Sequence, residues 1–249
     1  MSSERTADRR TMNGTDNNAY WLRPWSFQPH IAHLVVNHQR QVPSLSDVRQ
    51  WTDRLPDLGY TAVRTNALGR GAARQMECAG YTVLQELVLL ELTHLRRALN
   101  AMSASAEAND VGRIATKPLH TDQLEAVSDI DVAAFGFDWG LCEAAVTDVC
   151  GATPRHRLRG AGDPLAAFAI SGRDGRQGFL QRLSVSPEHQ RQGFGRALVI
   201  DSLEWMNRWH VQRVLVNTAF DNHAALALYQ GMGFRRIGER LRVFERSLL

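Results

Sequence analysis

One segment constrains the fold more than any other. A strand-like apolar run, a loop with two glycines and a helical pattern follow one another over residues 178–209. Gly193 and Gly195 allow the backbone of this loop to approach a bulky ligand. Free N–H groups at the start of the following helix favour an anionic group such as a pyrophosphate, to which Arg191 and Arg196 would add positive charge. Leu198 stands where a dinucleotide-binding fingerprint would have glycine, and the Lys-Ser/Thr pair of a P-loop is missing.

The surrounding pattern predicts an α+β fold. Asp174-Gly175 lies between two apolar runs and indicates a β-hairpin, because such turns favour residues that tolerate a positive φ. Thr121 is the expected N-cap of the first helix. In chain order we expect a strand over 113–118, helices over 121–135 and 141–149, hairpin strands over 165–171 and 178–185, a helix over 196–209, a strand over 213–220, a helix over 222–231 and a bent strand or strand pair over 234–248.

The first part of the chain contains a shorter version of the end of this plan. A shift of 153 positions, which places Leu45 on Leu198, brings six identical residues together over about forty positions. The predicted types agree as well: helix 45–55, strand 60–66, helix 70–79 and strand 81–92. We interpret this as a partial internal duplication, with coincidence as the alternative. The other identical pairs are Val63 and Val216, Thr65 and Thr218, Ala72 and Ala225, Gly80 and Gly233, and Glu86 and Glu239.

The chain is expected to contain one and a half domains. It has 249 residues, more than a typical domain of roughly 100–150. We expect a disordered N-terminus over 1–19, a degenerate half-domain over 20–99, a linker over 100–110 and a complete catalytic domain over 111–249. A run of small and polar residues there has the composition of a linker or of an exposed helix extension.

Composition excludes several classes of protein. The chain is 44% hydrophobic and 22% charged, which is typical of a globular protein. Its formal net charge is only +3, so a dedicated nucleic-acid binder is not expected. Three cysteines without close spacing predict no disulfide framework, and no apolar run is long enough to span a membrane. The charged first twenty residues do not resemble a secretory signal, so a cytoplasmic protein is expected.

No metal site is predicted. His30 and His33 are spaced like a pair of ligands, but they lack a third ligand. We therefore expect both to be surface residues.

The loop and a second motif together resemble a known family. The loop reads Gln190-x-x-Gly193-x-Gly195, and downstream stands Asn222-x-x-Ala225-x-x-x-Tyr229-x-x-x-Gly233-Phe234. In combination these motifs are similar to the acetyl-CoA signature of the GCN5-related N-acetyltransferase (GNAT) family. The resemblance covers about residues 113–249 and looks closest to the ribosomal-protein alanine N-acetyltransferase branch. It implies a mixed, splayed β-sheet flanked by helices, here preceded by a partial, degenerate copy.

The resemblance also implies the residues that bind acetyl-CoA. The strand over about 178–185 would bind pantetheine through its backbone, and the loop would hold the pyrophosphate. Asn222 is also an ordinary helix N-cap, and Ala225 an ordinary packing residue. The cofactor-binding residues implied in this way are Leu183, Ser184, Val185, Gln190, Arg191, Gln192, Gly193, Phe194, Gly195, Arg196, Asn222, Ala225 and Tyr229.

Tyr229 is the predicted catalytic residue. It lies seven residues after Asn222, about two helical turns, so both side chains can address one ligand. A lone tyrosine on an amphipathic helix is more often part of a core. Within this motif we interpret it as the general acid that protonates the leaving thiolate, because a phenol with a pKa of about 10 matches a thiol.

The general base is not identified by the sequence. Asn217 stands where the ribosomal-protein branch has a glutamate, and an amide cannot accept a proton near neutral pH. A water relay, Asp138 or Glu143 would be substitutes. The aromatic segment 135–139 lies where the family binds acceptors, and it would equally serve as hydrophobic core.

The first copy lacks this machinery. Met76 stands in the place of Tyr229, and Gly69 in the place of Asn222. The sequence before its helix is Val42-Pro-Ser-Leu45 rather than a glycine loop. We therefore expect it to bind no acetyl-CoA.

The resemblance implies an acetyl-CoA-dependent N-acetyltransferase without a metal. Its acceptor would be a primary amine of a protein N-terminus or a small molecule. An acyl-CoA-binding regulatory or scaffolding protein with weak or no turnover is the alternative. The acceptor's identity and the oligomeric state are not predicted.

Overall fold

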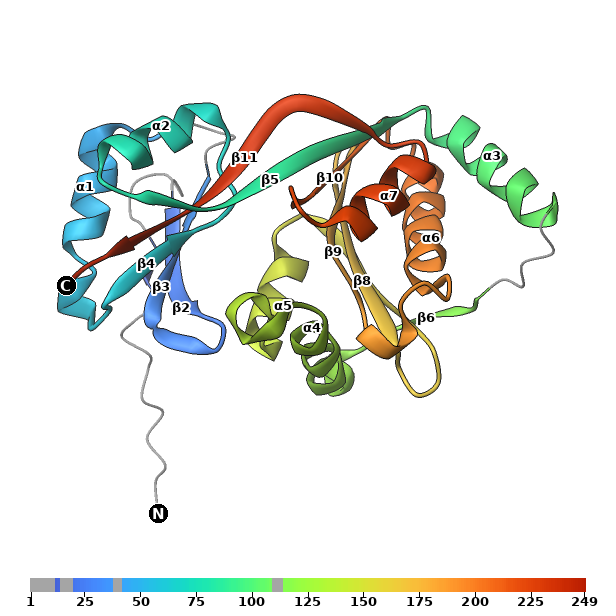
Figure 1. Cartoon of the computed structure of the whole chain (residues 1–249), viewed down its shortest axis with the longest axis horizontal. Helices are drawn as coiled ribbons and strands as arrows, with labels where there is room; N and C mark the ends of the chain where they lie inside the picture. The colour runs from blue at the N-terminus through green and yellow to red at the C-terminus, as the bar shows by residue number, and fades with distance from the viewer. Residues whose placement is uncertain (1–11, 14–19, 38–41, 109–113) are drawn as a thin grey trace, which may run out of the picture. The chain divides into compact units, whose positions relative to one another are not determined.

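The computed structural model describes residues 12–13, 20–37, 42–108 and 114–249. They form two compact units: unit 1 contains Met1–Val88 and Glu239–Leu249, and unit 2 contains Leu89–Gly238. The chain passes between the units within two long strands, β5 (Thr82–Thr93) and β11 (Arg235–Ser247) (Figure 1). This division differs from the expected boundary near residue 110. The expected disordered segment 1–19 lies outside the described residues, except for Met12–Asn13.

Unit 1 is a sheet covered by two helices. Its strands are β1 (Met12–Asn13), β2 (Tyr20–Trp25), β3 (Gln28–Val36) and β4 (Ala62–Thr65), and its helices are α1 (Leu45–Asp53), the short 3-10 helix η1 (Pro56–Leu58) and α2 (Arg70–Cys78). The strand order is β1-β2-β3-β4-β11-β5. Alternate residues of the strands, such as Leu34, Val63 and Phe244, pack against Val48 and Met76 of the helices in one buried core. The period of two along each strand selects this face.

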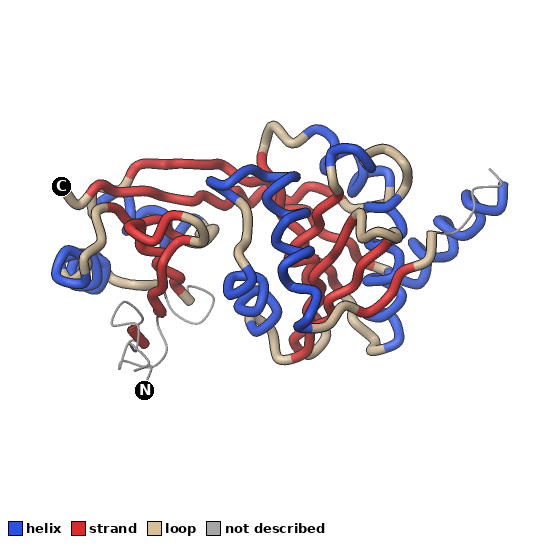
Figure 2. The backbone as a smooth tube through the Cα atoms, turned by 90° about the horizontal axis from the view of Figure 1, so that it is seen from below, coloured by secondary structure: helices blue, strands red, loops and turns tan. Residues whose placement is uncertain are grey.

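Unit 2 contains a larger sheet with helices on both faces (Figure 2). The strand order is β5-β10-β9-β8-β7-β6, in which β9 and β10 are parallel and β6 to β9 are antiparallel. Its elements are α3 (Leu95–Ala108), β6 (Thr116–Pro118), η2 (Thr121–Gln123), α4 (Leu124–Trp139), α5 (Glu143–Gly151), β7 (Arg155–Ala161), β8 (Ala167–Asp174), β9 (Gln177–Val185), η3 (Pro187–His189), α6 (Phe194–Arg208), β10 (Arg213–Ala219) and α7 (His223–Gly231).

The two faces of β8 carry two different cores. Phe168 and Ile170 pack against α4 and α5, whereas Ala167 and Ala169 pack against Leu198 of α6. Large residues therefore fill the α4–α5 face. On the other face, small residues let α6 lie close to the sheet. The glycine loop leads into this helix.

Each unit is completed by a strand from the other copy. In unit 1 the strand beside β4 is β11, which follows α7, and it pairs through Glu245 with Arg64. In unit 2 the strand beside β10 is β5, which follows α2, and Glu91 of β5 forms an ion pair with Arg213 of β10. The expected order of elements is therefore present in both copies, but their final strands are exchanged.

The segment expected to be a linker or an exposed helix extension is helical. Helix α3 covers residues 95–108 of the expected half-domain and linker, and residues 109–110 lie outside the described part of the chain. Leu95 and Met102 are buried at a spacing of seven, which is two helical turns, and α3 packs on α6. Small alanine residues, which suggested a linker, also favour a helix.

Four of the described strands lie outside the sequence expectation: β1, β2, β3 and β7. The hairpin of β2 and β3 precedes the first copy, and β7 precedes β8. Strand β7 was not expected because it carries arginines at alternate positions rather than an apolar run. Two of them, Arg157 and Arg159, form ion pairs with Asp201 of α6. Thr121, the expected N-cap, lies inside η2, and the N-cap is the preceding residue His120. The backbone N–H of His120 donates to the side-chain oxygen of Gln123.

His33 is more buried than expected. His30 is exposed as expected, but His33 is half-buried, and its ring lies 4.9 Å from the ring of Trp25. Burial, together with the positive charge of Arg23, lowers the pKa of His33 to about 3. A neutral imidazole in an aromatic cluster therefore replaces the expected solvated histidine.

Candidate active site

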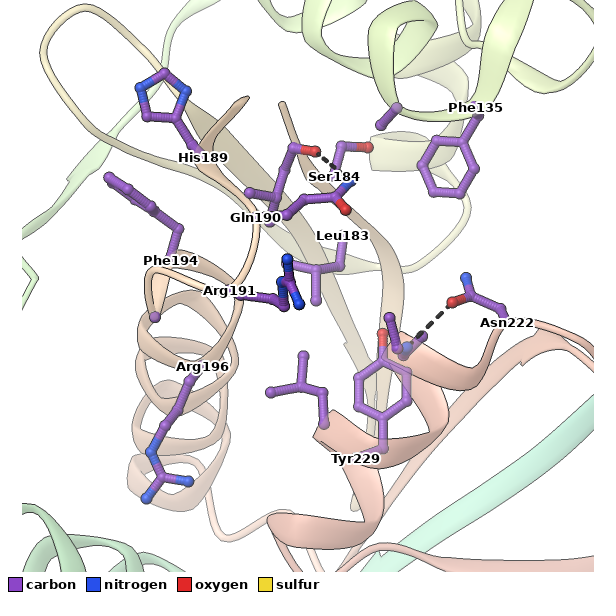
Figure 3. Close-up of a pocket in the computed structure, with 17 residues that line it drawn as sticks. Phe135, Leu183, Ser184, His189, Gln190, Arg191, Phe194, Arg196, Asn222 and Tyr229 are labelled. Carbon is purple, nitrogen blue, oxygen red and sulfur yellow. Dashed lines mark hydrogen bonds between the residues drawn. The ribbon is translucent and has the colours of Figure 1, made fainter. Parts of the chain in front are cut away.

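A cavity of about 450 Å³ opens at the carboxyl end of β9 in unit 2. Three elements predicted from sequence meet there: β9, the glycine loop with the start of α6, and α7 (Figure 3). Helix α4 closes the fourth side. The described residues that line the cavity are Ala134, Phe135, Leu183, Ser184, Val185, His189, Gln190, Arg191, Gly193, Phe194, Gly195, Arg196, Asn222, Ala224, Ala225, Leu228 and Tyr229.

A β-bulge begins the site on β9. Ile170 of β8 pairs with Arg182, but Ser171 pairs with Leu180, so Gln181 is an extra residue on β9. The last pair between β9 and β10 is Leu180 with Val216, at the same level. Bulges bend the strand that contains them. Beyond the bulge, β9 continues to Val185, and no described strand pairs with it on its β10 side.

This separation leaves two backbone donors facing the cavity side of β9. Ser186 donates its N–H to Ala166, on the β8 side. Because the backbone groups of a strand alternate between its two edges, the N–H groups of Leu183 and Val185 point to the opposite edge. Gln190 of the loop donates a hydrogen bond to the carbonyl oxygen of Val185 at 3.4 Å. The strand edge is therefore open to an extended ligand beside these two residues.

The glycine loop has the backbone conformation that its sequence requires. Gly193 is the N-cap of α6 and has a φ of 94°, a region that favours glycine, and Arg191 has a φ of 60°. No acidic residue lies in the first turn of α6, so the partial positive charge of the helix start is not neutralised there. In Figure 3 the side chain of Arg191 extends toward the middle of the cavity, whereas that of Arg196 extends away along α6.

Helix α7 contributes Asn222 and Tyr229. The side chain of Asn222 accepts a hydrogen bond from the N–H of Ala225 at 3.1 Å, which is an N-cap. Tyr229 is 5% exposed, and its hydroxyl points into the cavity (Figure 3). Burial raises the pKa of Tyr229 above its ordinary value, although the nearby Arg182 opposes this. The phenol is therefore held in its proton-donating form at neutral pH.

Helix α4 supplies the remaining wall, and it is interrupted there. Gly136 has φ 73° and ψ 171°, a conformation essentially restricted to glycine, so the helical course breaks after Phe135. Phe135 lines the cavity, whereas Phe137 is 67% exposed. The aromatic segment is therefore divided, and only its first residue contributes to the cavity.

A fully buried carboxylate lies behind this wall. Asp131 of α4 accepts hydrogen bonds from Arg182 at 2.8 and 2.6 Å, from the N–H of Leu141 at 2.8 Å and from the hydroxyl of Ser184. Sequence reasoning missed this group. A carboxylate beside Val127 and Ile130 on the apolar face of the helix was the signal that could have indicated it.

The other predicted residues differ in their outcome. Gln192 does not line the cavity, and its side chain donates to the carbonyl oxygen of Glu188 at 2.9 Å. Ser184 lines the cavity, but its side chain is bonded to Asp131 rather than turned to the loop. Asp138 and Glu143, the substitute bases, are exposed and absent from the lining, and so is Asn217. The lining residues His189, Ala224, Leu228 and Ala134 were not predicted.

The described residues contain no candidate metal site and no membrane-spanning helix. No group of three or more His, Cys, Asp or Glu side chains there could hold a metal ion. None of the described helices has the length and apolar character required to cross a membrane.

Known proteins share this region of the chain. The family model described as Acetyltransferase (GNAT) family matches residues 125–234. N-acetyltransferase family 8 member 3 of Rattus norvegicus is 47% identical over 60 residues, which are 24% of this chain and 26% of that protein. The chain therefore matches about a quarter of the length of this relative.

A bacterial relative is matched over more of its length. The ribosomal protein bS18-alanine N-acetyltransferase of Escherichia coli (strain K12) is 30% identical over 116 residues, which are 47% of this chain and 77% of that protein. This alignment agrees with the branch that the two motifs indicated.

Among solved structures, the fold is shared over nearly the whole chain. A tandem GNAT protein from the clavulanic acid biosynthesis pathway superposes with a TM-score of 0.61 at 17% identity, covering 92% of this chain and 78% of that one. The expected fold class, a mixed sheet flanked by helices in a two-part arrangement, is thereby confirmed. With an open strand edge, a glycine loop and a matching sequence in one unit, the chain belongs to the GNAT family of acetyltransferases.

Proposed function

We propose that the chain is an N-acetyltransferase that transfers the acetyl group of acetyl-CoA directly to a primary amine. The observation that carries the proposal is the convergence, in one cavity, of the open β9 edge, the start of α6 and the hydroxyl of Tyr229. An extended pantetheine chain suits the strand edge, and a pyrophosphate suits the loop. Acetyl-CoA, when bound, supplies an acetyl thioester whose carbonyl carbon is open to attack by an amine.

The protein groups have separate tasks in this reaction. The N–H groups of Leu183 and Val185 hold the pantetheine and stabilise the negative charge that develops on the carbonyl oxygen. The loop from Gln190 to Arg196 anchors the phosphates. Tyr229 donates a proton to the sulfur as the C–S bond breaks, while the new C–N bond forms.

The attacking amine loses its own proton to water. Among the described residues that line the cavity there is no carboxylate, and Asp131 already accepts four hydrogen bonds. The acceptor therefore enters as a neutral amine. The α-amine of a peptide suits this role better than a lysine side chain, because its pKa of about 8 leaves more of it neutral at physiological pH.

One acetyl-CoA is proposed to bind each chain, in unit 2. Unit 1 has Met76, which is fully buried, in the place of Tyr229. Its α1 is capped by Ser44 with a capping box to Asp47 instead of a glycine loop, and this places a carboxylate at the helix start. Negative charge at that position disfavours a phosphate.

A second function, acyl-CoA binding for regulation or scaffolding, is favoured by the absence of a carboxylate from the described cavity lining. The two functions differ in turnover. Thiol release from acetyl-CoA is to be measured with a panel of peptides and small amines. The enzyme proposal expects acceptor-dependent release, whereas binding without release on any acceptor would favour the second function.

Two substitutions separate binding from chemistry. Tyr229→Phe is expected to lower kcat by about 10²-fold or more, with the calorimetric Kd for acetyl-CoA nearly unchanged. Tyr81→Phe, in a buried tyrosine of unit 1, is the matched control. Gly193→Val is expected to abolish binding, whereas Gly175→Val, at a positive-φ glycine of the β8–β9 turn, should not. Undiminished affinity in Gly193→Val would contradict the loop assignment.

A further inference from the structure

The buried pair of Arg182 and Asp131 joins the two sides of the cavity. Arg182 lies on β9, directly before Leu183, and Asp131 lies on α4. The guanidinium donates through Nε and Nη2 to the two carboxylate oxygens, at 2.8 and 2.6 Å. Such a two-bond geometry fixes direction as well as distance, which a lysine cannot reproduce.

The same guanidinium also holds the interrupted end of α4. Its Nη2 donates to the carbonyl oxygen of Trp139 at 2.8 Å, and Asp131 accepts from the N–H of Leu141. These contacts lie on the far side of the break at Gly136. The chain on both sides of the break is therefore tied to β9 through one arginine.

Phe135 is the side chain that this arrangement positions. The guanidinium carbon of Arg182 lies 3.8 Å from the centre of the Phe135 ring, over one face. That face is therefore covered by a cation whose charge Asp131 balances. Phe135 lines the cavity together with Ala134, opposite α6 in Figure 3. The part of the ring not covered by Arg182 forms an apolar wall there.

We propose that Arg182 is a positioning residue that holds Phe135 as the acceptor-contacting wall, so that preferred acceptors carry an apolar group on the carbon that bears the amine. This inference rests on the proposed N-acetyltransferase function and adds the class of acceptor. A charged group at that carbon, of either sign, is disfavoured because it would have to lie against the apolar ring of Phe135.

The experiment uses the full-length protein and four amines: the α-amides of glycine, leucine, phenylalanine and aspartate. The wild type is expected to prefer leucinamide and phenylalaninamide over glycinamide in kcat/KM by about tenfold or more, the usual effect of a matched apolar contact. Phe135→Ala should reduce this preference to within about threefold, mainly through KM for the acceptor. Arg182→Lys should do the same, and the double variant should lose little more.

Arg159→Lys is the matched control. Arg159 of β7 forms a part-buried ion pair with Asp201 of α6 and donates to the carbonyl oxygen of Thr116, outside the cavity. Its loss should lower Tm without changing the acceptor preference. The Kd for acetyl-CoA should stay within about threefold in all variants, because the loop and strand edge are intact.

Several outcomes would overturn the inference. One is an unchanged preference of Phe135→Ala for leucinamide and phenylalaninamide over glycinamide. Because Phe135 is only half-buried, this variant should fold even if Arg182→Lys does not. Another is a uniform loss for all four amines and for acetyl-CoA binding in Arg182→Lys, which indicates a purely structural role. Faster turnover of aspartate α-amide than of leucinamide would overturn the inference but leave the proposed function standing. No acceptor-dependent turnover on any amine would overturn both.

Discussion

The side-chain amide of Asn66 pairs with the backbone of Val36 in unit 1. Its Oδ1 accepts from the N–H of Val36 at 2.9 Å, and its Nδ2 donates to the carbonyl oxygen of Val36 at 3.3 Å. Val36 ends β3, as Val185 ends β9, and each strand is parallel to the next strand of its copy. Within unit 1, Asn66 therefore occupies the edge of β3 that corresponds to the open edge of β9 in unit 2.

This contact predicts a stoichiometry of one acetyl-CoA per chain. Asn66→Ala should lower the free energy of unfolding by about 1–3 kcal/mol, because two backbone groups lose their partner. It should not create a second site, since the glycine loop is still missing. Calorimetric titration of the wild type and of Asn66→Ala measures the number of acetyl-CoA molecules bound per chain. Two equivalents in either protein would contradict the prediction. Asn217→Ala, at an exposed asparagine of β10, should change stability by no more than about 0.5 kcal/mol.

The pH dependence of kcat should show no alkaline loss from Tyr229. Its pKa is raised by burial, so the phenol keeps its proton as pH rises through the ordinary value of about 10. At saturating acceptor, kcat should therefore rise with the neutral amine and then stay level up to about pH 10. The measurement is a steady-state profile of wild type and Tyr229→Phe. A fall in the wild type with an apparent pKa below about 9 would contradict this prediction.

Tyr81 should make stability decline at high pH. Burial raises the pKa of Tyr81 to about 12, although a hydrogen bond with Thr52 and the charge of Arg246 oppose this. A raised pKa stabilises the folded state fully below the unfolded value of about 10, and this stabilisation is lost as pH rises toward the folded value. At about pH 11 the loss is ~1 kcal/mol. Tyr81→Phe should flatten the decline in denaturant unfolding experiments, and an equal decline in both proteins would exclude this cause.

Gly136→Ala should destabilise unit 2. The φ of 73° and ψ of 171° are accessible to glycine and strained for alanine by about 1–3 kcal/mol. Gly151→Ala, at the end of α5 with no atom within 4 Å of the added Cβ, is the control and should be neutral or slightly stabilising. Thermal unfolding compares the two. Equal Tm values would mean that the break in α4 is not held in solution.

A fragment of residues 111–249 should fail to fold as a cooperative unit. It lacks β5, which lies beside β10, and it lacks α3, which packs on α6. Val214 and Val216 of β10 are buried, and the row of backbone groups at the β10 edge would be left unpaired. Circular dichroism and size-exclusion chromatography compare this fragment with the full chain. A monomeric fragment with a sharp unfolding transition would contradict the exchange of strands.

The elements of the proposed cofactor side could be predicted from sequence because their signals are local. The glycine loop begins α6 as expected, Asn222 caps α7, and Tyr229 lies two turns further along the same helix. The contacts that hold the proposed acceptor side could not be predicted. Asp131 and Arg182 are 51 positions apart, and only the packing of α4 on β9 brings the two side chains together.

The sequence by itself determined the order of helices and strands around the glycine loop and which copy retains Tyr229, since capping, turns and periodicity depend on neighbouring residues. The tertiary structure decided which strands pair. Arg64 meets Glu245 across 181 positions, and Arg213 meets Glu91 across 122. Strand pairing joins segments that are distant along the chain and is selected by burial of a whole face. No spacing in the sequence therefore indicates that the two copies exchange their final strands.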